Sequence, residues 1–302
     1  MQEQEEASKS YADIASQLDL GIPAIGGGSE ELQIVGLPDN DASSFTVSGI
    51  LFTPIKLPLT NDVELSMIYA KAQRMVNSPR RWIQEGLAHY AQSEFIERQQ
   101  GRQSALDYLN SHAASLVQAE KPADTAGRDW QASNSLINGS DDVAHQTKAM
   151  YVWWMLRDML GGLPVTALLD YHSDEDKDGA YLQRLIQTHN HRDLEWFFDD
   201  WVYRDRGLPD FRVSSVYPRK LVDGGYMVTV EVENLGDAGA EVPVTLHIPG
   251  KDVMERMEVH AKSKASVRIA CSSVPTDVVV NDGSVPESDM GNNTFKVPNP
   301  EP

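Results

Sequence analysis

The hydrophobic residues of this chain change their spacing near residue 207. Before that point apolar residues recur every three to four positions, as in amphipathic helices. Beyond it they alternate in short runs separated by Gly, Pro and Asn. A chain that changes its period in this way cannot be built from helices alone or from strands alone. We therefore expect an α+β protein with two domains, 1–208 and 209–302.

The first domain is expected to be mostly helical, with a small N-terminal sheet. Two strand-like runs, 32–37 and 45–55, supply the sheet. A cap at Asn61 or Asp62 starts the second helix. Helices are expected at 11–20, 62–76, 81–99, 104–118, 143–160, 163–171, 180–188 and 194–203.

The second domain shows the period-two alternation of half-buried strands. About seven short strands in about 90 residues are typical of an antiparallel, immunoglobulin-like β-sandwich. Glycine-rich turns separate the first few of these strands. Strands are expected at 211–217, 226–232, 242–248, 254–260, 265–270 and 278–280.

Charge and cysteine content exclude several classes of function. The chain has 26 Lys and Arg against 45 Asp and Glu, a net charge of −19, which argues against binding nucleic acid or a basic membrane patch. The single Cys271 excludes an intrachain disulfide and a cysteine-based zinc site. Apolar runs are only a few residues long, so we expect no membrane span. The N-terminus MQEQEEASKSY has no apolar h-region, so we do not expect it to be an intact signal peptide.

The most informative stretch is 80–90, with the sequence RRWIQEGLAHY. It reads as the start of a helix that places aromatic and aliphatic residues toward the core. Glu85 and His89 are four residues apart, so both project from one face. They could ligate one metal ion or hydrogen-bond each other.

WIQEGLAHY resembles the second motif of the gluzincin metallopeptidases, Trp-Leu-x-Glu-Gly-Phe/Leu-Ala-x-Tyr. In that family the glutamate is the third zinc ligand, and it matches Glu85. The segment 148–157, followed by Gly161, resembles the helix after the family's transition-state-stabilising tyrosine. The segment 192–209 resembles the end of its helical part. The resemblance implies a gluzincin-like (peptidase MA-like, aminopeptidase-type) fold over about residues 60–209.

The zinc-binding motif of that family is missing. It needs His-Glu-x-x-His on a helix, so that two imidazoles bind zinc and the glutamate deprotonates a bound water. No two histidines of this chain are four apart. The aminopeptidase spacing, counted back from Glu85, places Asp62 and Ser66 at the histidine positions and Val63 at the glutamate position.

A shorter spacing, found in the wider clan, gives a second register. It places Tyr69 and Gln73 at the histidine positions and Ala70 at the glutamate position. We favour this register, because Tyr69 and Gln73 share one face of a good helix. The position of the catalytic tyrosine carries Gln146, beside His145. A standard zinc peptidase is therefore not expected.

Three functions stay open. The first, which we favour, is a pseudoenzyme in which Tyr69, Gln73 and Gln146 surround Glu85 and line a groove for a peptide or a glycan. The other two are hydrolases of altered mechanism. One pairs Glu85 with a second carboxylate, such as Glu64 or Asp62, as glycosidases do. The other rebuilds a metal site from Glu85, His89 and His145, in which zinc is possible.

An acidic stretch and the C-terminal domain complete the sequence features. Asp174, Asp176 and Asp178 match the first half of a Ca²⁺-binding EF-hand loop, but its twelfth position is Leu185, so we expect an acidic loop instead. The segments 228–236, 262–267 and 287–295 resemble the adhesion-related (CARDB-like) sandwich domains of bacterial extracellular proteins. That resemblance implies a bracing or docking role and an extracytoplasmic (periplasmic or secreted) protein. The sequence does not indicate an oligomeric state.

Overall fold

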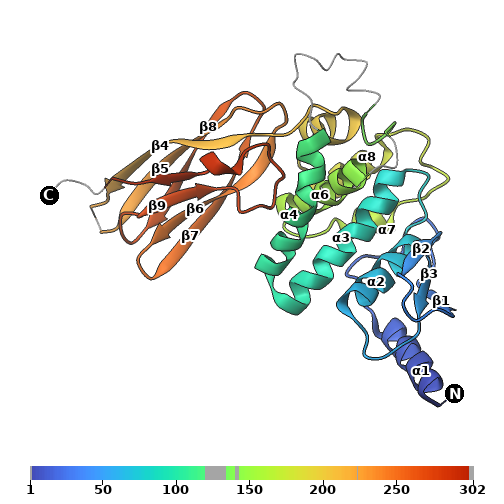
Figure 1. The fold of residues 1–302 in the computed structure, drawn as a ribbon. Helices are drawn as coiled ribbons and strands as arrows, with labels where there is room; N and C mark the ends of the chain where they lie inside the picture. Colours follow the sequence, from blue (N-terminus) through green and yellow to red (C-terminus); the bar gives the residue numbers. More distant parts are fainter. Residues whose placement is uncertain (1, 120–133, 140–142, 223, 299–302) are drawn as a thin grey trace. The chain divides into compact units, whose positions relative to one another are not determined.

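The computed structural model describes residues 2–119, 134–139, 143–222 and 224–298 (Figure 1). Packing divides them into two compact units. The first contains the described residues of 1–108 and 140–194, and the second those of 109–139 and 195–302. Helices and sheets are both present, so the predicted α+β class is confirmed. The strands of the second unit begin at Phe211, near the expected boundary, but residues 195–208 group with that unit.

The first unit combines a small sheet with helices (Figure 1). The sheet has the order β1-β3-β2, with β1 and β3 parallel and β2 and β3 forming an antiparallel hairpin. Its elements are α1 (Gln2–Gln17), β1 (Gln33–Leu37), β2 (Phe45–Val47), β3 (Ile50–Pro54), α2 (Asn61–Met75), α3 (Arg81–Gln100), α6 (Val143–Leu160), α7 (Val165–Leu169) and α8 (Tyr181–Asn190). A further helix, α4 (Arg102–Ala119), follows α3 and extends into the residues of the second unit.

The run 45–55, expected to be one strand, is a hairpin. Ser48 and Gly49 have φ values of 50° and 75°, so both residues of the two-residue turn lie in the left-handed region. That is the geometry of a type I′ turn, whose twist matches that of paired strands. Ser48 takes up this conformation although it is not a glycine. The turn places Gly49 above α2, where its amide donates to Gln73.

Helix α2 is held at its first turn by a side-chain cap. The hydroxyl of Thr60 accepts a hydrogen bond from the amide of Val63 at 3.4 Å, and Asp62 and Glu64 place negative charge near the helix N-terminus. The cap is therefore Thr60, one or two residues before the expected Asn61 or Asp62. Helix α2 ends at Met75, the chain then turns back, and α3 begins at Arg81.

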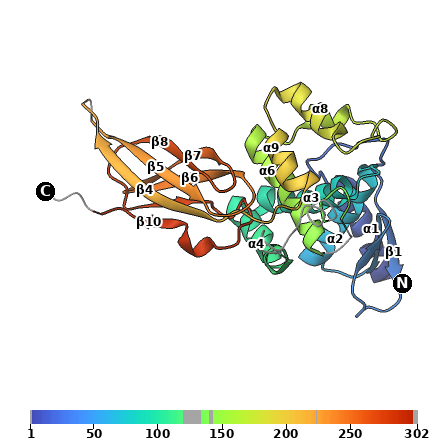
Figure 2. The same cartoon turned by 90° about the horizontal axis from the view of Figure 1, so that it is seen from above.

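Helices α3 and α6 pack closely because Gly86 has no side chain (Figures 1 and 2). A Cβ atom at Gly86 would lie 2.6 Å from Cδ1 of Trp153 and 2.9 Å from the carbonyl oxygen of Ala149. Trp153 is fully buried and stacks on Trp82 at 5.7 Å between ring centroids. The glycine of the EGLAHY stretch thus sets the distance between two helices.

Gly86→Ala is expected to lower the free energy of unfolding by about 2 kcal/mol, because overpacking at the helix contact outweighs the better helix propensity of alanine. Urea unfolding followed by circular dichroism measures this change. An unchanged or higher midpoint would mean that α3 and α6 can separate at no cost.

The second unit contains two antiparallel sheets, of order β10-β9-β6-β7 and β4-β5-β8 (Figure 2). Alternate residues of β5 and β6 are buried, including Val228, Val230 and Leu246, so each sheet has one face in the core. Its elements are α9 (Glu195–Phe198), a π-helix (Asp199–Tyr203), β4 (Phe211–Lys220), β5 (Tyr226–Asn234), β6 (Ala240–Ile248), β7 (Lys251–Val259), β8 (Lys264–Cys271), β9 (Asp277–Val280), a 3₁₀ turn (Met290–Asn292) and β10 (Thr294–Lys296).

The π-helix is attached to the sheets by a buried tryptophan. The indole nitrogen of Trp201 donates to the carbonyl oxygen of Gly239 at 2.7 Å, and Trp201 is fully buried. This bond explains why the last helical residues group with the second unit. Over the described parts of the chain, none of the helices combines the length and apolar character that crossing a bilayer requires.

Candidate functional site

Glu85 lies at the contact between α2 and α3 and is almost completely buried, with 8% of its surface exposed. The two helices run antiparallel. Gln73 of α2 contacts Glu85 of α3, Tyr69 contacts His89, and the carbonyl of Leu65 accepts from Gln92. A carboxylate buried in this way needs hydrogen-bond donors to replace the water it has lost.

Tyr69 and Gln73 supply those donors. The hydroxyl of Tyr69 donates to Oε2 of Glu85 at 2.5 Å, and the amide nitrogen of Gln73 donates to Oε1 at 3.1 Å. The Gln73 amide also donates to the Tyr69 hydroxyl at 2.8 Å. The three side chains that the second register places together therefore form one hydrogen-bonded group, which we call the Glu85 triad.

The orientation of Gln73 is fixed from its other side. Its Oε1 accepts a hydrogen bond from the amide of Gly49 at 3.1 Å, so its nitrogen must point toward Glu85. Gln84 ties the same region together, because its amide nitrogen donates to the carbonyls of Gln73 and Val76. The β2–β3 turn, the end of α2 and the start of α3 thus hold the triad in one geometry.

Uncharged donors make the close contacts of Glu85. Within the described ranges, the ion pair of Glu85 is with Arg81, whose Nη2 lies 4.0 Å from Oε1 on a side chain that is 61% exposed. An exposed ion pair of this length contributes little. The two short hydrogen bonds therefore carry most of the stabilisation of the carboxylate.

Tyr69→Phe is expected to lower the free energy of unfolding by about 2 kcal/mol, because the hydroxyl donates to a buried charged acceptor. Tyr108→Phe is the matched control. Its hydroxyl donates to the neutral Oε1 of Gln92 at 3.0 Å, so about 1 kcal/mol is expected there. Chemical denaturation of both variants gives the comparison. Equal losses would mean that Glu85 is not stabilised by Tyr69 as a charged group.

His89 lies beside the triad, but its ring contacts Tyr69 and its Nδ1 contacts Gln92. Its ring packs on Tyr69 at 4.8 Å between centroids, and Nδ1 lies 2.9 Å from Oε1 of Gln92. The nitrogen of Gln92 donates to the carbonyl of Leu65, so its oxygen faces His89 and Nδ1 carries the proton. One of the two ring nitrogens is therefore already used within the helix contact.

The donor set does not fit a zinc ion. Tyr69 and Gln73 direct hydrogens at Glu85, and an amide nitrogen is not a ligand for zinc. In the residues with described positions there is no group of three or more His, Cys, Asp or Glu side chains that could hold a metal. A site rebuilt from Glu85, His89 and His145 is thus not formed.

Two carboxylates of the acidic loop after α7 already accept hydrogen bonds from nearby side chains. Asp176 accepts hydrogen bonds from Nε of Arg80 at 3.1 Å and from the hydroxyl of Tyr171 at 2.7 Å. Asp178 accepts from both terminal nitrogens of Arg184. These carboxylates stabilise the loop and are not arranged as a Ca²⁺ site with Asp174.

The remaining candidates lie elsewhere. The antiparallel pairing puts Leu65 level with Gln92, so Asp62 and Ser66 of the first register lie about two helical turns from Glu85. Glu64 lines a cavity with Phe95, which is about 15 Å from Glu85 along the axis of α3. Carboxylate pairing between Glu64 and Glu85 is therefore not present.

Gln146 and His145 occupy the first turn of α6 and are half-buried. His145 is one helical turn before Ala149, whose carbonyl lies against Gly86, the neighbour of Glu85. The structure thus places these two residues on the helix that packs against α3. They are not members of the Glu85 triad.

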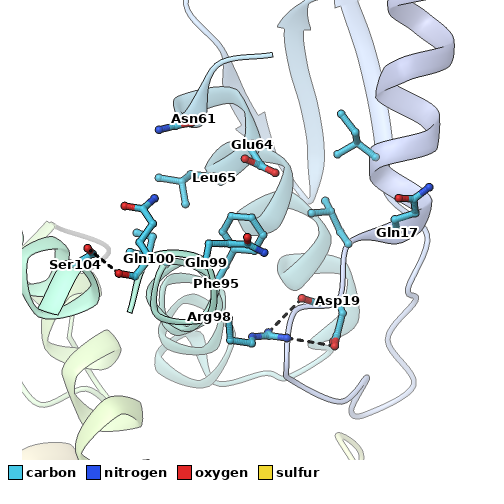
Figure 3. A pocket seen from close by; sticks show the side chains of 13 residues that line it. Gln17, Asp19, Asn61, Glu64, Leu65, Phe95, Arg98, Gln99, Gln100 and Ser104 are labelled. Atoms are coloured by element: carbon cyan, nitrogen blue, oxygen red, sulfur yellow. Dashed lines mark hydrogen bonds and ion pairs between the residues drawn. The ribbon is translucent and has the colours of Figure 1, made fainter. Parts of the chain in front are cut away.

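The cavity that contains Glu64 was not predicted from the sequence. It has a volume of about 580 Å³ and lies between α1, α2, α3 and the start of α4 (Figure 3). Its lining comes from four separate segments, 14–19, 61–65, 95–100 and residue 104. No motif marks such a site, because only the packing of the helices brings these segments together.

Neither a protein-family model nor a curated protein matches the sequence. Among solved structures, the chain is similar to a β-glucosidase from Streptomyces venezuelae in complex with D-glucose, with 16% identity and a TM-score of 0.20 over 34% of this chain. It spans only 17% of the length of that enzyme. It is also similar to an alkylpurine DNA glycosylase from Pseudomonas fluorescens bound to DNA with an abasic site analogue, with 12% identity and a TM-score of 0.20 over 80% of this chain and 83% of that one. Neither likeness supports an assignment of fold family or function.

Proposed function

We propose that this protein binds an extended peptide beside Glu85 without hydrolysing it, on a scaffold of degenerate gluzincin type. The observation that carries the proposal is the Glu85 triad. The two positions that the family resemblance gives to imidazoles hold Tyr69 and Gln73, and both donate hydrogen bonds to Glu85. Both carboxylate oxygens of Glu85 therefore accept hydrogens from these two side chains.

The absence of hydrolysis follows from the residue at the general-base position. In the favoured register that position is Ala70, which is fully buried and has no group that could accept a proton. Water activation by a peptidase needs both a metal ion and a base. With neither in place, a bound peptide would not be attacked.

The free edge of β2 favours a peptide as the ligand. Val47 pairs with Ile50, and Phe45 pairs with Phe52, in the narrow hairpin. Hydrogen-bonded pairs alternate along such a ladder, beginning at the turn, so the backbone amide and carbonyl of Thr46 face away from β3. In the described part of the chain these two groups have no partner, and β2 is an edge strand. A peptide strand can add to such an edge.

The edge is connected to the triad. Gly49, in the turn that follows β2, donates to Gln73, which donates to Glu85. A strand paired with Thr46 would therefore run close to the position of the former zinc site. Phe45 and Val47 are about half exposed and can contact alternate side chains of the ligand.

The contacts of Glu85 do not favour the hydrolase alternatives. Both carboxylate oxygens accept hydrogen bonds from fixed uncharged donors, and Glu64 lies in the separate cavity. A glycosidase needs two carboxyl groups at about 5–10 Å across one bond. We therefore do not carry the carboxylate pair forward.

Selection from a synthetic heptapeptide library, with mass-spectrometric identification of the retained peptides, tests the proposal. Thr46→Pro removes the outward-facing amide and is expected to weaken a selected peptide about tenfold, near the worth of one backbone hydrogen bond. Thr46→Ala, which keeps the backbone, is the matched control and should bind as the wild type does. Circular dichroism establishes that both variants fold. A library that yields no ligand, or binding equal in both variants, would contradict the proposal.

For the second unit we propose an immunoglobulin-like, CARDB-like sandwich that braces the helical unit or docks on a surface, in an extracytoplasmic protein. Its two antiparallel sheets support the sandwich. The net charge of −19 suits a solvated surface and supports the absence of nucleic acid among the partners.

A further inference from the structure

A separate cavity lies at the opposite end of the α2–α3 pair from the Glu85 triad. Its volume of about 580 Å³ falls in the range of pockets for small ligands, about 300–1,000 Å³. Figure 3 shows side chains of α1, α2 and α3 around it, with Phe95 and Leu65 between the polar groups. Every lining residue belongs to the first unit.

Several exposed or half-buried polar side chains around this cavity make no hydrogen bond to other described residues, so they are accessible to a ligand in exchange for water. Four are carboxamides, Gln17, Asn61, Gln99 and Gln100, and one is the carboxylate of Glu64. Each carboxamide can both donate and accept hydrogen bonds. Groups of this kind match a ligand that carries donors and acceptors in equal measure, such as a row of hydroxyl groups.

The positive charge at the cavity is already neutralised. Nη1 of Arg98 lies 3.2 Å from Oδ2 of Asp19, and Nη2 donates to the Asp19 carbonyl (Figure 3). Nε of Arg98 lies 3.6 Å from Oε1 of Glu94. Two carboxylates therefore balance this guanidinium. An anionic ligand would find no available cation here and would be repelled by Glu64.

The floor of the cavity is apolar. Leu18 and Ile96 are 8% and 7% exposed, and Phe95 and Leu65 are half-buried beside them. A flat aromatic ring next to carboxamides suits a ligand that has a face of C–H groups and a rim of hydroxyls. A sugar ring has both.

We propose that this cavity binds a short neutral saccharide, with its ring against Phe95 and its hydroxyl groups hydrogen-bonded to the carboxamides and to Glu64. Four of the polar lining side chains are uncharged carboxamides, which suits a neutral ligand. Glu64 would also attract a cation, so the test includes a cationic ligand. This site is separate from the peptide site proposed above, so either proposal can be contradicted while the other stands.

Titration calorimetry with four disaccharides, maltose, cellobiose, lactose and N,N′-diacetylchitobiose, tests the proposal. At least one is expected to bind with a Kd of about 1 mM or tighter. Gln99→Ala and Phe95→Ala should each weaken that binding about tenfold. Gln99 is exposed at the end of α3, so its variant is expected to fold even if the Phe95 variant does not.

Gln33→Ala is the matched control, because Gln33 is an exposed carboxamide on β1 outside the cavity. It should bind the disaccharide as the wild type does. The proposal is overturned if none of the four binds, or if Gln99→Ala and Gln33→Ala bind equally. Binding of the tripeptide Gly-Arg-Gly in place of the sugars also overturns it, since Glu64 would then select a cation. Peptide selection with the cavity variants reports separately on the site at Thr46.

Discussion

Replacing both Tyr69 and Gln73 by histidine is expected to make this protein bind one equivalent of zinc. The two residues are four apart on α2 and both already contact Glu85, at 2.5 Å and 3.1 Å. Imidazole nitrogens at these positions, with the Glu85 carboxylate, form the His₂Glu ligand set of a catalytic zinc site. Because the antiparallel helices hold all three positions, little backbone movement is needed.

The measurement is the metal content after dialysis against excess zinc sulfate, together with a competition titration. We expect a Kd in the micromolar range or tighter, about 8 kcal/mol of binding free energy. Adding Glu85→Ala to the double variant should weaken binding strongly. The matched control is Asp62→His with Ser66→His, which has the same spacing on the same helix but lies level with Gln92, about two helical turns from Glu85. Equal zinc binding by both double variants would mean that the wrong register has been assigned to Glu85.

A second large effect is expected from Glu287, in the second unit, when the pH is changed. Burial raises the pKa of this carboxyl from its ordinary 4.5 to about 7, and the nearby Asp210 adds to the shift. Three donors oppose it, the amide of Phe211 at 2.9 Å and the side chains of Asn281 and Asn293. Glu287 thus joins the start of β4 to the turn after β9.

The sign of the pH dependence follows from the raised pKa. Below pH 4.5 the carboxyl is protonated in both states and incurs no penalty. As the pH rises from 4.5 to 7 the unfolded chain loses its proton first, so the free energy of unfolding falls. The shift of about 2.5 units corresponds to about 3 kcal/mol, lost by the time the pH exceeds the folded pKa.

Urea unfolding of wild type and Glu287→Gln between pH 4 and pH 8 measures this dependence. The difference between the two curves should change by about 3 kcal/mol across that range. Glu255→Gln, at an exposed position of β7, controls for the loss of one negative charge. Parallel curves for wild type and Glu287→Gln would show that the carboxyl does not titrate between the two states as described.

Local pattern was enough to predict the central helices and most strands. The expected helix 81–99 is Arg81–Gln100, and the expected strand 226–232 is Tyr226–Asn234. The first helix was expected at 11–20 but covers Gln2–Gln17, because its charged N-terminal half has no clear apolar face. The run 194–203 was expected to be one helix, but it ends as a π-helix, in which the indole of Trp201 donates a hydrogen bond to the carbonyl of Gly239.

The Glu85 triad could be predicted because its members follow helical spacing. Residues 69 and 73 share a face by the i, i+4 rule, and the motif around Glu85 fixes the facing helix. The contacts of His89 could not be predicted from the spacing of Glu85 and His89. The imidazole hydrogen-bonds Gln92, whose Oε1 also accepts from Tyr108 of the next helix, α4. The cavity depends on segments about 80 residues apart in sequence, 14–19 and 95–104, and local sequence patterns do not reveal which distant segments come into contact.

The most direct test of the account is hydrolysis of the synthetic heptapeptide library by the wild-type protein, measured by mass spectrometry after prolonged incubation with and without added zinc. The proposed function predicts that peptides are retained at full length under both conditions, because the carboxylate is held by two proton donors and the proposed general-base position carries Ala70. New cleavage products that disappear in Glu85→Gln would contradict it.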